Sequence, residues 1–440
     1  MTLAQIWLIA LIVKLALSAW LPMSADEAYY WVWSHNPQWN YYDHPAGVSW
    51  LFWLGRHALG DMASTSRWPA VILAHMSLWI WVDLLKPYFD SSKLRWFLIL
   101  ACLSPIVGPG SLIVTPDLPM IFFWTLGIWV IHRYLTTEKP ALLVLLGLVL
   151  GFGFIGKYVT AIFLPIGLLA LAFHRKLTLK SLPWILLGFV GFLVGSFPVW
   201  LWNLQNDWAS FRFQLDHGLG EPTYEVAWTV EYLLGQAAIA FPTVLFAAWM
   251  SIKRKAPAWL IIFSLGPIVF FFLTSFKGNT EANWPVTAHL PLLVLALWGS
   301  TKYRWAKASA VIWGLALILV LAEVQFRFLP DPKSKLKTAE FHKYDQILEN
   351  WPQQGPVFAR TYQMASKLSF ERRHPVYKLR GMNRHDEYDR MDGSMPKTNT
   401  FVLIRKTYEA YPKWMQERGF DVLERQELDR RFEFAKVQLR

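Results

Sequence analysis

Long apolar stretches alternate with short polar loops from the N-terminus to about residue 327. They predict eleven apolar spans, at residues 3–22, 66–85, 96–114, 117–133, 141–156, 158–173, 182–202, 227–250, 258–276, 285–300 and 308–326. Apolar runs of about 18 residues or more are candidates for transmembrane helices, and the proline and glycine inside several of them are tolerated in a helical bundle. The pattern therefore predicts an α-helical polytopic membrane protein.

Charged residues in the loops orient this bundle. Every second loop is basic, and together these loops and the span ends next to them hold fourteen Lys or Arg residues and three acids. The other loops and the span ends next to them hold twelve acids and six Lys or Arg residues. Because basic loops stay in the cytoplasm, the alternation predicts a cytoplasmic N-terminus and places the acidic loops on the far face. An odd number of spans places everything after the last span on that face too.

The composition changes after residue 327. Residues 328–440 hold 22 Lys or Arg and 16 Asp or Glu residues, with no long apolar run. "GPVFAR" and "NTFVLIRK" have the pattern of strands bounded by turn residues, and "KWMQERGF" that of a helix end followed by a glycine stop. We expect a membrane domain over residues 1–327 and a small soluble α/β domain over residues 328–440.

The amino-acid composition supports a membrane protein and excludes several other classes of protein. Hydrophobic residues make up 54% of the chain and charged residues 17%, below the roughly 25% that is usual in soluble proteins. The single cysteine, Cys102, excludes a disulfide within the chain and a thiolate metal site. The net charge of +12 does not indicate nucleic acid, since its basic residues follow the loop alternation. We expect the first span to be retained rather than cleaved, because Lys14 lies inside it and no small-residue cleavage site precedes Asp26.

The longest far-face loop carries the first chemical candidates. Asp26 and Glu27 are adjacent just after the first span. Neighbouring carboxylates repel, which raises one pKa and suits a general base near neutral pH; the alternative is a polar anchor at a helix end. In "YYDHP", Tyr42, Asp43 and His44 are candidates for holding phosphate or a cation, against the alternative of an aromatic belt at the membrane interface. The apolar stretch that follows is too short to span and predicts an interfacial helix.

Further candidates lie in the other far-face loops. Asp117 in "TPDLP" is either functional or a helix N-terminal acid. Lys157 interrupts an apolar stretch, which indicates function unless its side chain reaches up to the surface. The remaining candidates are Arg212, His217, Lys277, Glu281 and Asn283. Carboxylates and aromatic rings suit sugars, and lysines suit a lipid-borne phosphate. The chain lacks Walker and HExxH motifs.

Six sequence stretches together resemble a known family. They are "ADEAYYWVWS", "YYDHPAGVSWL", "TPDLPMIFFW", "GFGFIGKYVTAIFLP", "VWLWNLQNDWASFRFQLDHG" and "KGNTEANWP". In this order and spacing, over about residues 1–300, they resemble the bacterial membrane glycosyltransferases of the protein-mannosyltransferase-like superfamily. These have the GT-C fold and include aminoarabinose and galacturonic acid transferases acting on lipid A or the lipopolysaccharide core.

The resemblance implies a GT-C fold of about eleven transmembrane helices in the bacterial inner membrane, with the far face periplasmic. It implies inverting transfer of a monosaccharide from a polyprenyl-phosphate donor to a hydroxyl or phosphate of a lipid or glycan acceptor. The general base maps to Asp26, with Glu27 beside it. In relatives, a lysine holds the donor phosphate, and it maps to His44 in the Asp43-His44-Pro45 triplet. Lys157 is a second candidate for binding this phosphate. A divalent metal with Asp43, His44 or His217 as ligands stays open, and no other cofactor is expected.

Three other functions remain as alternatives. They are a protein O-glycosyltransferase of the same fold, a transporter or flippase for a lipid-linked sugar, and a binding module without catalysis. Polar candidates cluster on one face instead of lining a path through the spans, which favours chemistry at the surface over transport. The expected partners are therefore the lipid-borne donor, a lipid or glycan acceptor and membrane lipids, with no nucleic acid.

Overall fold

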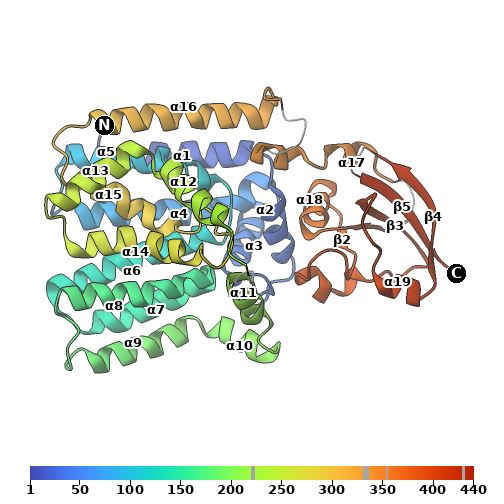
Figure 1. Cartoon of the computed structure of the whole chain (residues 1–440), viewed down its shortest axis with the longest axis horizontal. Helices are drawn as coiled ribbons and strands as arrows, with labels where there is room; N and C mark the ends of the chain where they lie inside the picture. The colour runs from blue at the N-terminus through green and yellow to red at the C-terminus, as the bar shows by residue number, and fades with distance from the viewer. Residues whose placement is uncertain (220–222, 331–335, 353–354, 429–431) are drawn as a thin grey trace. The chain divides into compact units, whose positions relative to one another are not determined.

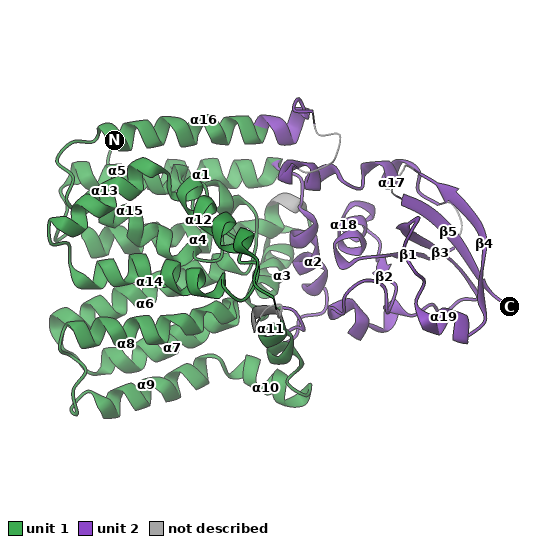
Figure 2. Ribbon diagram, in the orientation of Figure 1, with its two compact units in different colours: residues 1–20, 44–321 green, residues 21–43, 322–440 purple. Residues whose placement is uncertain are grey.

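The computed structural model describes the chain except residues 220–222, 331–335, 353–354 and 429–431, and it leaves out the side chains of residues 63–64 and 217–219. The chain divides into two compact units (Figure 2). Unit 1 comprises residues 1–20 and 44–321, and unit 2 comprises residues 21–43 and 322–440. The first part of the first predicted far-face loop therefore groups with the C-terminal residues, which are more than 270 positions away in the chain.

Helices build unit 1 (Figure 1). They are α1 Leu3–Trp20, α3 Gly47–Leu59, α4 Ala63–Leu85, α5 Ser91–Leu103, α6 Asp117–Thr137, α7 Ala141–Gly156, α8 Phe163–Phe173, α9 Leu182–Gly195, α10 Phe197–Gln205, α11 Ala209–Leu219, α12 Val226–Ala240, α13 Pro242–Lys253, α14 Ala258–Thr274, α15 His289–Trp298 and α16 Arg304–Phe326, whose end is grouped with unit 2. Short 3-10 turns are η1 Pro109–Leu112, η2 Tyr158–Ile162 and η3 Val286–Ala288. Each predicted span coincides with one or more of these elements, and the predicted interfacial helix is α3.

Only some of these helices are long enough to cross a membrane alone. In the described part of the chain, four pass by length and apolar composition, namely α1, α4, α6 and α16. Two bent pairs raise the number to six: α9 with α10, at 61°, and α12 with α13, at 87°. The predicted span 96–114 is not one helix, because α5 ends at Leu103 and η1 follows. The count of eleven spans therefore stays a prediction.

Glycines set the closest packing in unit 1. A Cβ on Gly147 of α7 would lie 1.7 Å from the carbonyl oxygen of Gly188 on α9, and one on Gly151 would lie 2.5 Å from that of Phe192. No side chain fits there, so these positions require glycine. Small residues that let helix backbones approach are typical of membrane bundles, and they explain why α7 and α9 form the most extensive helix pair of the unit.

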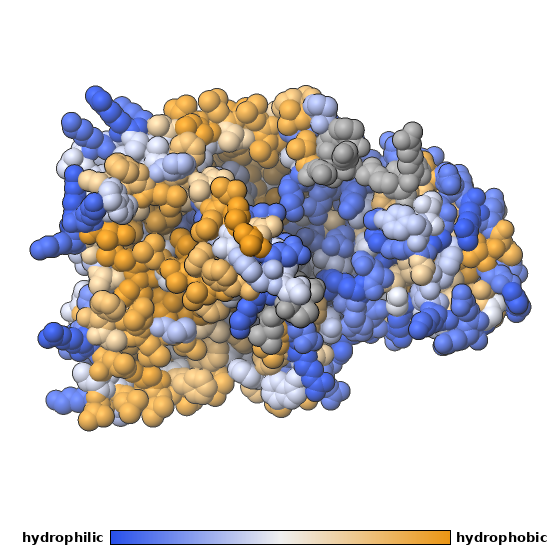
Figure 3. All heavy atoms as spheres, in the orientation of Figure 1, coloured by the Kyte–Doolittle hydropathy of each residue, from blue (hydrophilic) through white to orange (hydrophobic). Residues whose placement is uncertain are grey.

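The outer surface of unit 1 is apolar. Figure 3 shows apolar side chains over most of its visible face, and α9 exposes Leu186, Phe189, Val190 and Val194. Inside the unit, the ammonium of Lys14 is buried and donates to the carbonyl of Val107 and the hydroxyl of Ser111, at 3.1 and 2.9 Å. This pattern is that of a bundle solvated by lipid, with an internal charge satisfied by polar atoms.

Unit 2 combines one helix from the first loop with a small mixed sheet. Its elements are α2 Ala25–Trp33, η4 Lys337–His342, α17 Asp345–Glu349, β1 Val357–Ala359, α18 Tyr362–Arg372, β2 Tyr377–Lys378, η5 Glu387–Arg390, η6 Asp392–Ser394, β3 Thr400–Lys406, α19 Lys413–Glu417, β4 Phe420–Glu427 and β5 Phe432–Leu439. The strand order is β2-β1-β3-β5-β4. β1 is parallel to β2 and β3, while β5 is antiparallel to β3 and β4.

The small C-terminal sheet confirms the predicted α/β composition. Both predicted strands form, as β1 and β3, and α19 ends just before Gly419, whose φ of 76° is easily adopted only by glycine. The register pairs Leu403 of β3 with Ala435 of β5. A core that includes Phe358, Leu403 and Val437 lies against this sheet. α18 connects β1 to β2 and packs against α2, so the sheet side of unit 2 supports the helix that carries Asp26 and Glu27.

Candidate functional site

The adjacent acids Asp26 and Glu27 have different surroundings. Ser24 is the N-cap of α2: its hydroxyl accepts from the Glu27 N–H at 3.2 Å, and Glu27 Oε2 accepts from the Ser24 N–H at 2.9 Å. This reciprocal arrangement is a capping box. Glu27 is fully buried, whereas Asp26 is only half-buried. The geometry therefore gives Glu27 a structural partner at the helix start and leaves Asp26 the more accessible of the two acids.

The negative charge of Asp26 acts on two tyrosines, Tyr344 and Tyr362. Burial raises the pKa of Tyr362 well above its usual value, and the negative charge of Asp26 adds to the effect. Burial also raises the pKa of Tyr344 to about 12, again with a contribution from Asp26. The guanidinium of Arg384 lies 4.6 Å from the centre of the Tyr362 ring. Tyr362 is thus near enough to both a carboxylate and a permanent cation to interact with each of them.

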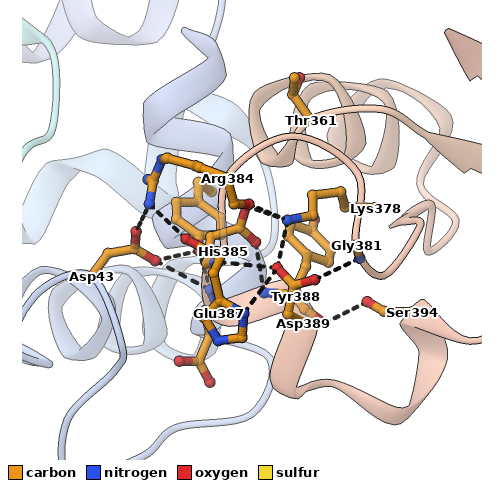
Figure 4. A network of polar contacts seen from close by, with 12 residues as sticks. Asp43, Thr361, Lys378, Gly381, Arg384, His385, Glu387, Tyr388, Asp389 and Ser394 are labelled. Atoms are coloured by element: carbon orange, nitrogen blue, oxygen red, sulfur yellow. Dashed lines mark hydrogen bonds and ion pairs between the residues drawn. The ribbon is translucent and has the colours of Figure 1, made fainter. Parts of the chain in front are cut away.

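Asp43 holds Arg384 in place (Figure 4). Asp43 Oδ1 is 2.7 Å from Arg384 Nη1. Its Oδ2 accepts from the Tyr29 hydroxyl at 2.6 Å and from the Glu387 N–H at 3.2 Å. Burial opposes the charge of Arg384, but Asp43 and Tyr362 together outweigh it, so the pKa of Arg384 is raised. Asp43 is 3% exposed and the Arg384 side chain 38%. The carboxylate therefore acts as a buried support for a cation that still faces solvent.

Tyr42 is tied to the same region through its backbone. Its N–H donates to Glu387 Oε2 at 2.8 Å, and Gln38 Nε2 donates to Oε1 of the same carboxylate at 3.1 Å. Burial raises the pKa of Glu387 to about 7, against the opposing effect of the Tyr42 hydrogen bond. The Tyr42 ring packs edge-on against His385, with 4.7 Å between ring centres. Hydrogen bonds to the buried Glu387 thus join the two chain segments of unit 2, residues 21–43 and residues 322–440.

Lys378 fixes the segment that contains Arg384. Its ammonium donates to Asp386 at 2.7 Å, to Asp389 at 2.5 Å and to the carbonyl of Arg384 at 2.7 Å (Figure 4). Burial raises the pKa of Asp386 to about 6 although Lys378 opposes the shift. Lys378 is itself fully buried. Such a satisfied network holds the backbone around Arg384 in one conformation.

Asp117 and Lys157 are brought together in unit 1. Lys157 Nζ is 2.8 Å from Asp117 Oδ1, and the two side chains are 15% and 14% exposed. Asp117 is the first residue of α6, where a negative charge is favoured by the helix dipole. Lys157 is the C-cap of α7. The charges of the two predicted site residues therefore compensate each other.

The other predicted site residues of unit 1 have less defined surroundings. His44 is half-buried, while Arg212, Lys277, Glu281 and Asn283 are exposed. His217 lies on α11, but its side chain is outside the described residues. Among the residues that the structure does describe, no group of three or more His, Cys, Asp or Glu is arranged to hold a metal ion. Since Asp43 is bound by Arg384, Tyr29 and Glu387, we derive no step through a metal.

Sequence reasoning missed Arg384, Tyr362 and Glu387. Arg384 and Glu387 lie in the stretch "RHDEYDR", residues 384–390, where charged residues of both signs follow one another. This dense run of charged residues is visible in the sequence. The sequence does not show that residues 21–43 group with this part of the chain, so the run could not be assigned to a site.

Comparisons with known proteins bear on the fold. Residues 43–202 match the family model described as dolichyl-phosphate-mannose-protein mannosyltransferase. The lipid A galacturonosyltransferase RgtD of Rhizobium johnstonii is 24% identical over 313 residues, which are 67% of this chain and 64% of that protein. The chain thus matches a little less than two thirds of that relative's length.

Two solved structures cover nearly the whole chain. They are ArnT from Cupriavidus metallidurans in the apo state, with a TM-score of 0.68 at 12% identity, and the same protein bound to undecaprenyl phosphate, with a TM-score of 0.67 at 14% identity. Each comparison covers 98% of this chain and 97% of the other. At these identities they show a common fold. Together, the family match, the curated relative and the solved structures confirm that this chain has the GT-C fold and resembles the membrane glycosyltransferases of the protein-mannosyltransferase-like superfamily.

Proposed function

We propose that the protein is an inverting glycosyltransferase of the periplasmic face of the bacterial inner membrane. It moves a monosaccharide from a polyprenyl-phosphate donor to a hydroxyl or phosphate of a lipid or glycan acceptor such as lipid A or the lipopolysaccharide core. The observation that carries the proposal is the half-buried Asp26, whose charge acts on Tyr362, with Arg384 4.6 Å from the centre of the same ring and Glu27 engaged in capping. The names of RgtD and of ArnT bound to undecaprenyl phosphate support the choice of acceptor and donor.

Asp26 is the general base in this mechanism. An acceptor hydroxyl is a weak nucleophile, and removing its proton during attack accelerates the reaction by about 10²–10⁴-fold. The acceptor oxygen bonds to the anomeric carbon as the bond from that carbon to the phosphate oxygen breaks. The proton passes to Asp26, and the electron pair leaves with the phosphate. One displacement inverts the anomeric centre, as in glycosidases that use one base and no carboxylate nucleophile.

Arg384 stabilises the leaving phosphate. A guanidinium presents several N–H donors in a planar fork that matches phosphate oxygens, and a donor already in position is effective because no reorganisation is needed as charge develops. Asp43 and Tyr362 position Arg384 from two sides. Phosphate binding by His44 stays a prediction. Lys157 is a weaker candidate than the sequence suggests, since Asp117 already compensates its charge.

The test uses the full chain, purified and reconstituted in lipid vesicles. Undecaprenyl-phosphate-linked galacturonic acid and aminoarabinose are supplied with lipid A or core oligosaccharide, and products are identified by mass spectrometry, with the anomeric configuration assigned by NMR. We expect a glycosylated acceptor of inverted configuration. If the donor crosses the vesicle bilayer without being cleaved, the protein is a transporter and the proposal is wrong. If sugar is transferred only to a peptide hydroxyl, the acceptor is a protein and not a lipid or glycan.

A further inference from the structure

Unit 2 contains a hollow beyond the C-terminal end of α2. Its volume is about 580 Å³, and α2, the segment after it, α18, β2 and the η5–η6 turns contribute to its wall. Small-molecule sites usually have volumes of about 300–1,000 Å³. Trp31 lines the hollow and Asp26 does not. Five residues of helix, about 7.5 Å of rise, separate the two, so the hollow lies apart from Asp26, although Glu387 belongs both to its lining and to the hydrogen bonds around Asp43.

Aromatic rings form part of this wall. Trp31 and Tyr377 both line the hollow. A Cβ on Gly393 would lie 2.3 Å from Tyr377 Cζ, so only a glycine lets the tyrosine ring occupy its place. The Arg373 guanidinium lies 5.9 Å from the centre of the Trp31 ring. Rigid aromatic faces offer a large contact area at low entropic cost, and they pack against the C–H faces of a pyranose.

The polar lining is nearly balanced in charge. Two arginines, Arg373 and Arg390, are matched by two acids, Glu387 and Asp392. Gln38 also lines the hollow and donates to the Glu387 carboxylate at 3.1 Å. Carboxylates accept hydrogen bonds from hydroxyl groups, and guanidinium and amide groups donate to them. Because burial raises the pKa of Glu387 to about 7, this acid carries only part of its charge at neutral pH, and the lining has a small positive charge. A lining with donors, acceptors and so little net charge favours an uncharged polyol over an anion, which would require a larger excess of positive charge.

We propose that this hollow is a binding site for an uncharged pyranose. Its C–H face packs on Tyr377 beside the largely buried Trp31, while its hydroxyls exchange hydrogen bonds with Arg373, Arg390 and the exposed Asp392. The role of the site, but not its existence, rests on the proposed function: it would bind a sugar unit of the acceptor and hold it near α2. Sugar recognition in the C-terminal unit then determines which glycans are modified.

Binding is measured on the full chain in lipid nanodiscs, because maltoside detergents themselves carry pyranose rings. The probe is methyl β-D-glucopyranoside, followed by saturation-transfer NMR, with glucose 6-phosphate and inorganic phosphate as comparison ligands. We expect a Kd on the order of 1 mM for the neutral glycoside. Its C–H protons should receive more saturation than the methyl group, because they pack on the rings.

Three variants make the test specific. Arg373→Gln and Tyr377→Ala should each weaken binding by about fivefold or more. Arg372→Gln is the matched control: this adjacent arginine is exposed, lies over Trp351 and does not line the hollow. It should bind like the wild type. Arg373→Gln removes an exposed side chain, so it tests the site even if Tyr377→Ala fails to fold.

Two results would overturn the inference. One is the lack of saturation transfer to the neutral glycoside in the wild type. The other is tighter binding of glucose 6-phosphate or inorganic phosphate, which would make the hollow an anion site. Asp26→Asn should keep full glycoside binding, because Asp26 is outside the lining. A wild type that binds the glycoside and transfers no sugar would refute the proposed function and leave this site standing.

Discussion

Replacing Glu387 by glutamine should change how the stability of unit 2 depends on pH. The carboxylate is 2% exposed, and burial raises its pKa from 4.5 to about 7. A buried acid whose pKa is raised stabilises the fold below its unfolded pKa, and this stability is lost as pH rises through the folded pKa. In the wild type, this acid therefore makes unit 2 less stable at pH 8 than at pH 4.5. Glutamine removes that dependence, since an amide does not ionise.

The size of the effect follows from the two pKa values. A shift from 4.5 to about 7 corresponds to about 3 kcal/mol at about 1.4 kcal/mol for each pKa unit. The difference in unfolding free energy between Glu387→Gln and the wild type should therefore change by about 3 kcal/mol between pH 4.5 and pH 8, in favour of the variant at high pH. Asp386 also has a raised pKa, but it is present in both proteins and cancels in the comparison to first order.

Hydrogen exchange read by mass spectrometry is the assay, because it reports the opening of unit 2 separately from that of unit 1. Comparing variants at the same pH removes the intrinsic pH dependence of exchange. Glu424→Gln is the matched control: it removes one carboxylate from an exposed position on β4, and its protection should follow the wild type at every pH. Equal pH dependence in Glu387→Gln and the wild type would refute the reasoning that burial governs this acid.

Three further predictions concern other contacts. Asp117→Asn should destabilise unit 1 by about 1–3 kcal/mol, because Lys157 loses its charged partner. Adding Lys157→Met should restore the unfolding temperature. An unchanged unfolding temperature in Asp117→Asn alone would contradict the pairing. Gly393→Ala should cost about 1–3 kcal/mol in thermal unfolding, because the new Cβ displaces the Tyr377 ring; wild-type stability would show that the ring moves freely. Arg384→Gln should lower kcat for transfer by about 10²–10³-fold, with partial recovery in Arg384→Lys; an effect on KM alone would show that Arg384 does not stabilise the leaving phosphate.

The sequence predicted the helical membrane part well because apolar runs are local signals. α1, α4, α6 and α16 follow their predicted spans closely. The bends within α9–α10 and α12–α13 escaped prediction, because a proline inside a membrane helix is compatible with either a straight or a broken span. The short strands of unit 2 were predicted where turn residues bounded them, as for β1 and β3.

The site was only half predictable, for a physical reason. Asp26 stood out because a second carboxylate, Glu27, adjoins it, and Asp43 because it lies in the stretch "YYDHP". Arg384 and Tyr362 did not, since charged and aromatic residues are ordinary in a soluble domain. Their importance arises from contacts over more than 300 residues of chain, such as that between Asp43 and Arg384. Periodicity and composition carry no signal for such pairings.

Single-turnover transfer by Asp26→Asn, compared with Glu27→Gln, tests the central claim most directly. Glutamine can still accept from the Ser24 N–H in the capping box, so Glu27→Gln should retain transfer within about tenfold of the wild type. Asp26→Asn should lose about 10²–10⁴-fold in the rate of the chemical step, with insertion into the membrane unchanged. The reverse ranking, or wild-type turnover by Asp26→Asn, would contradict the assignment of Asp26 as the base.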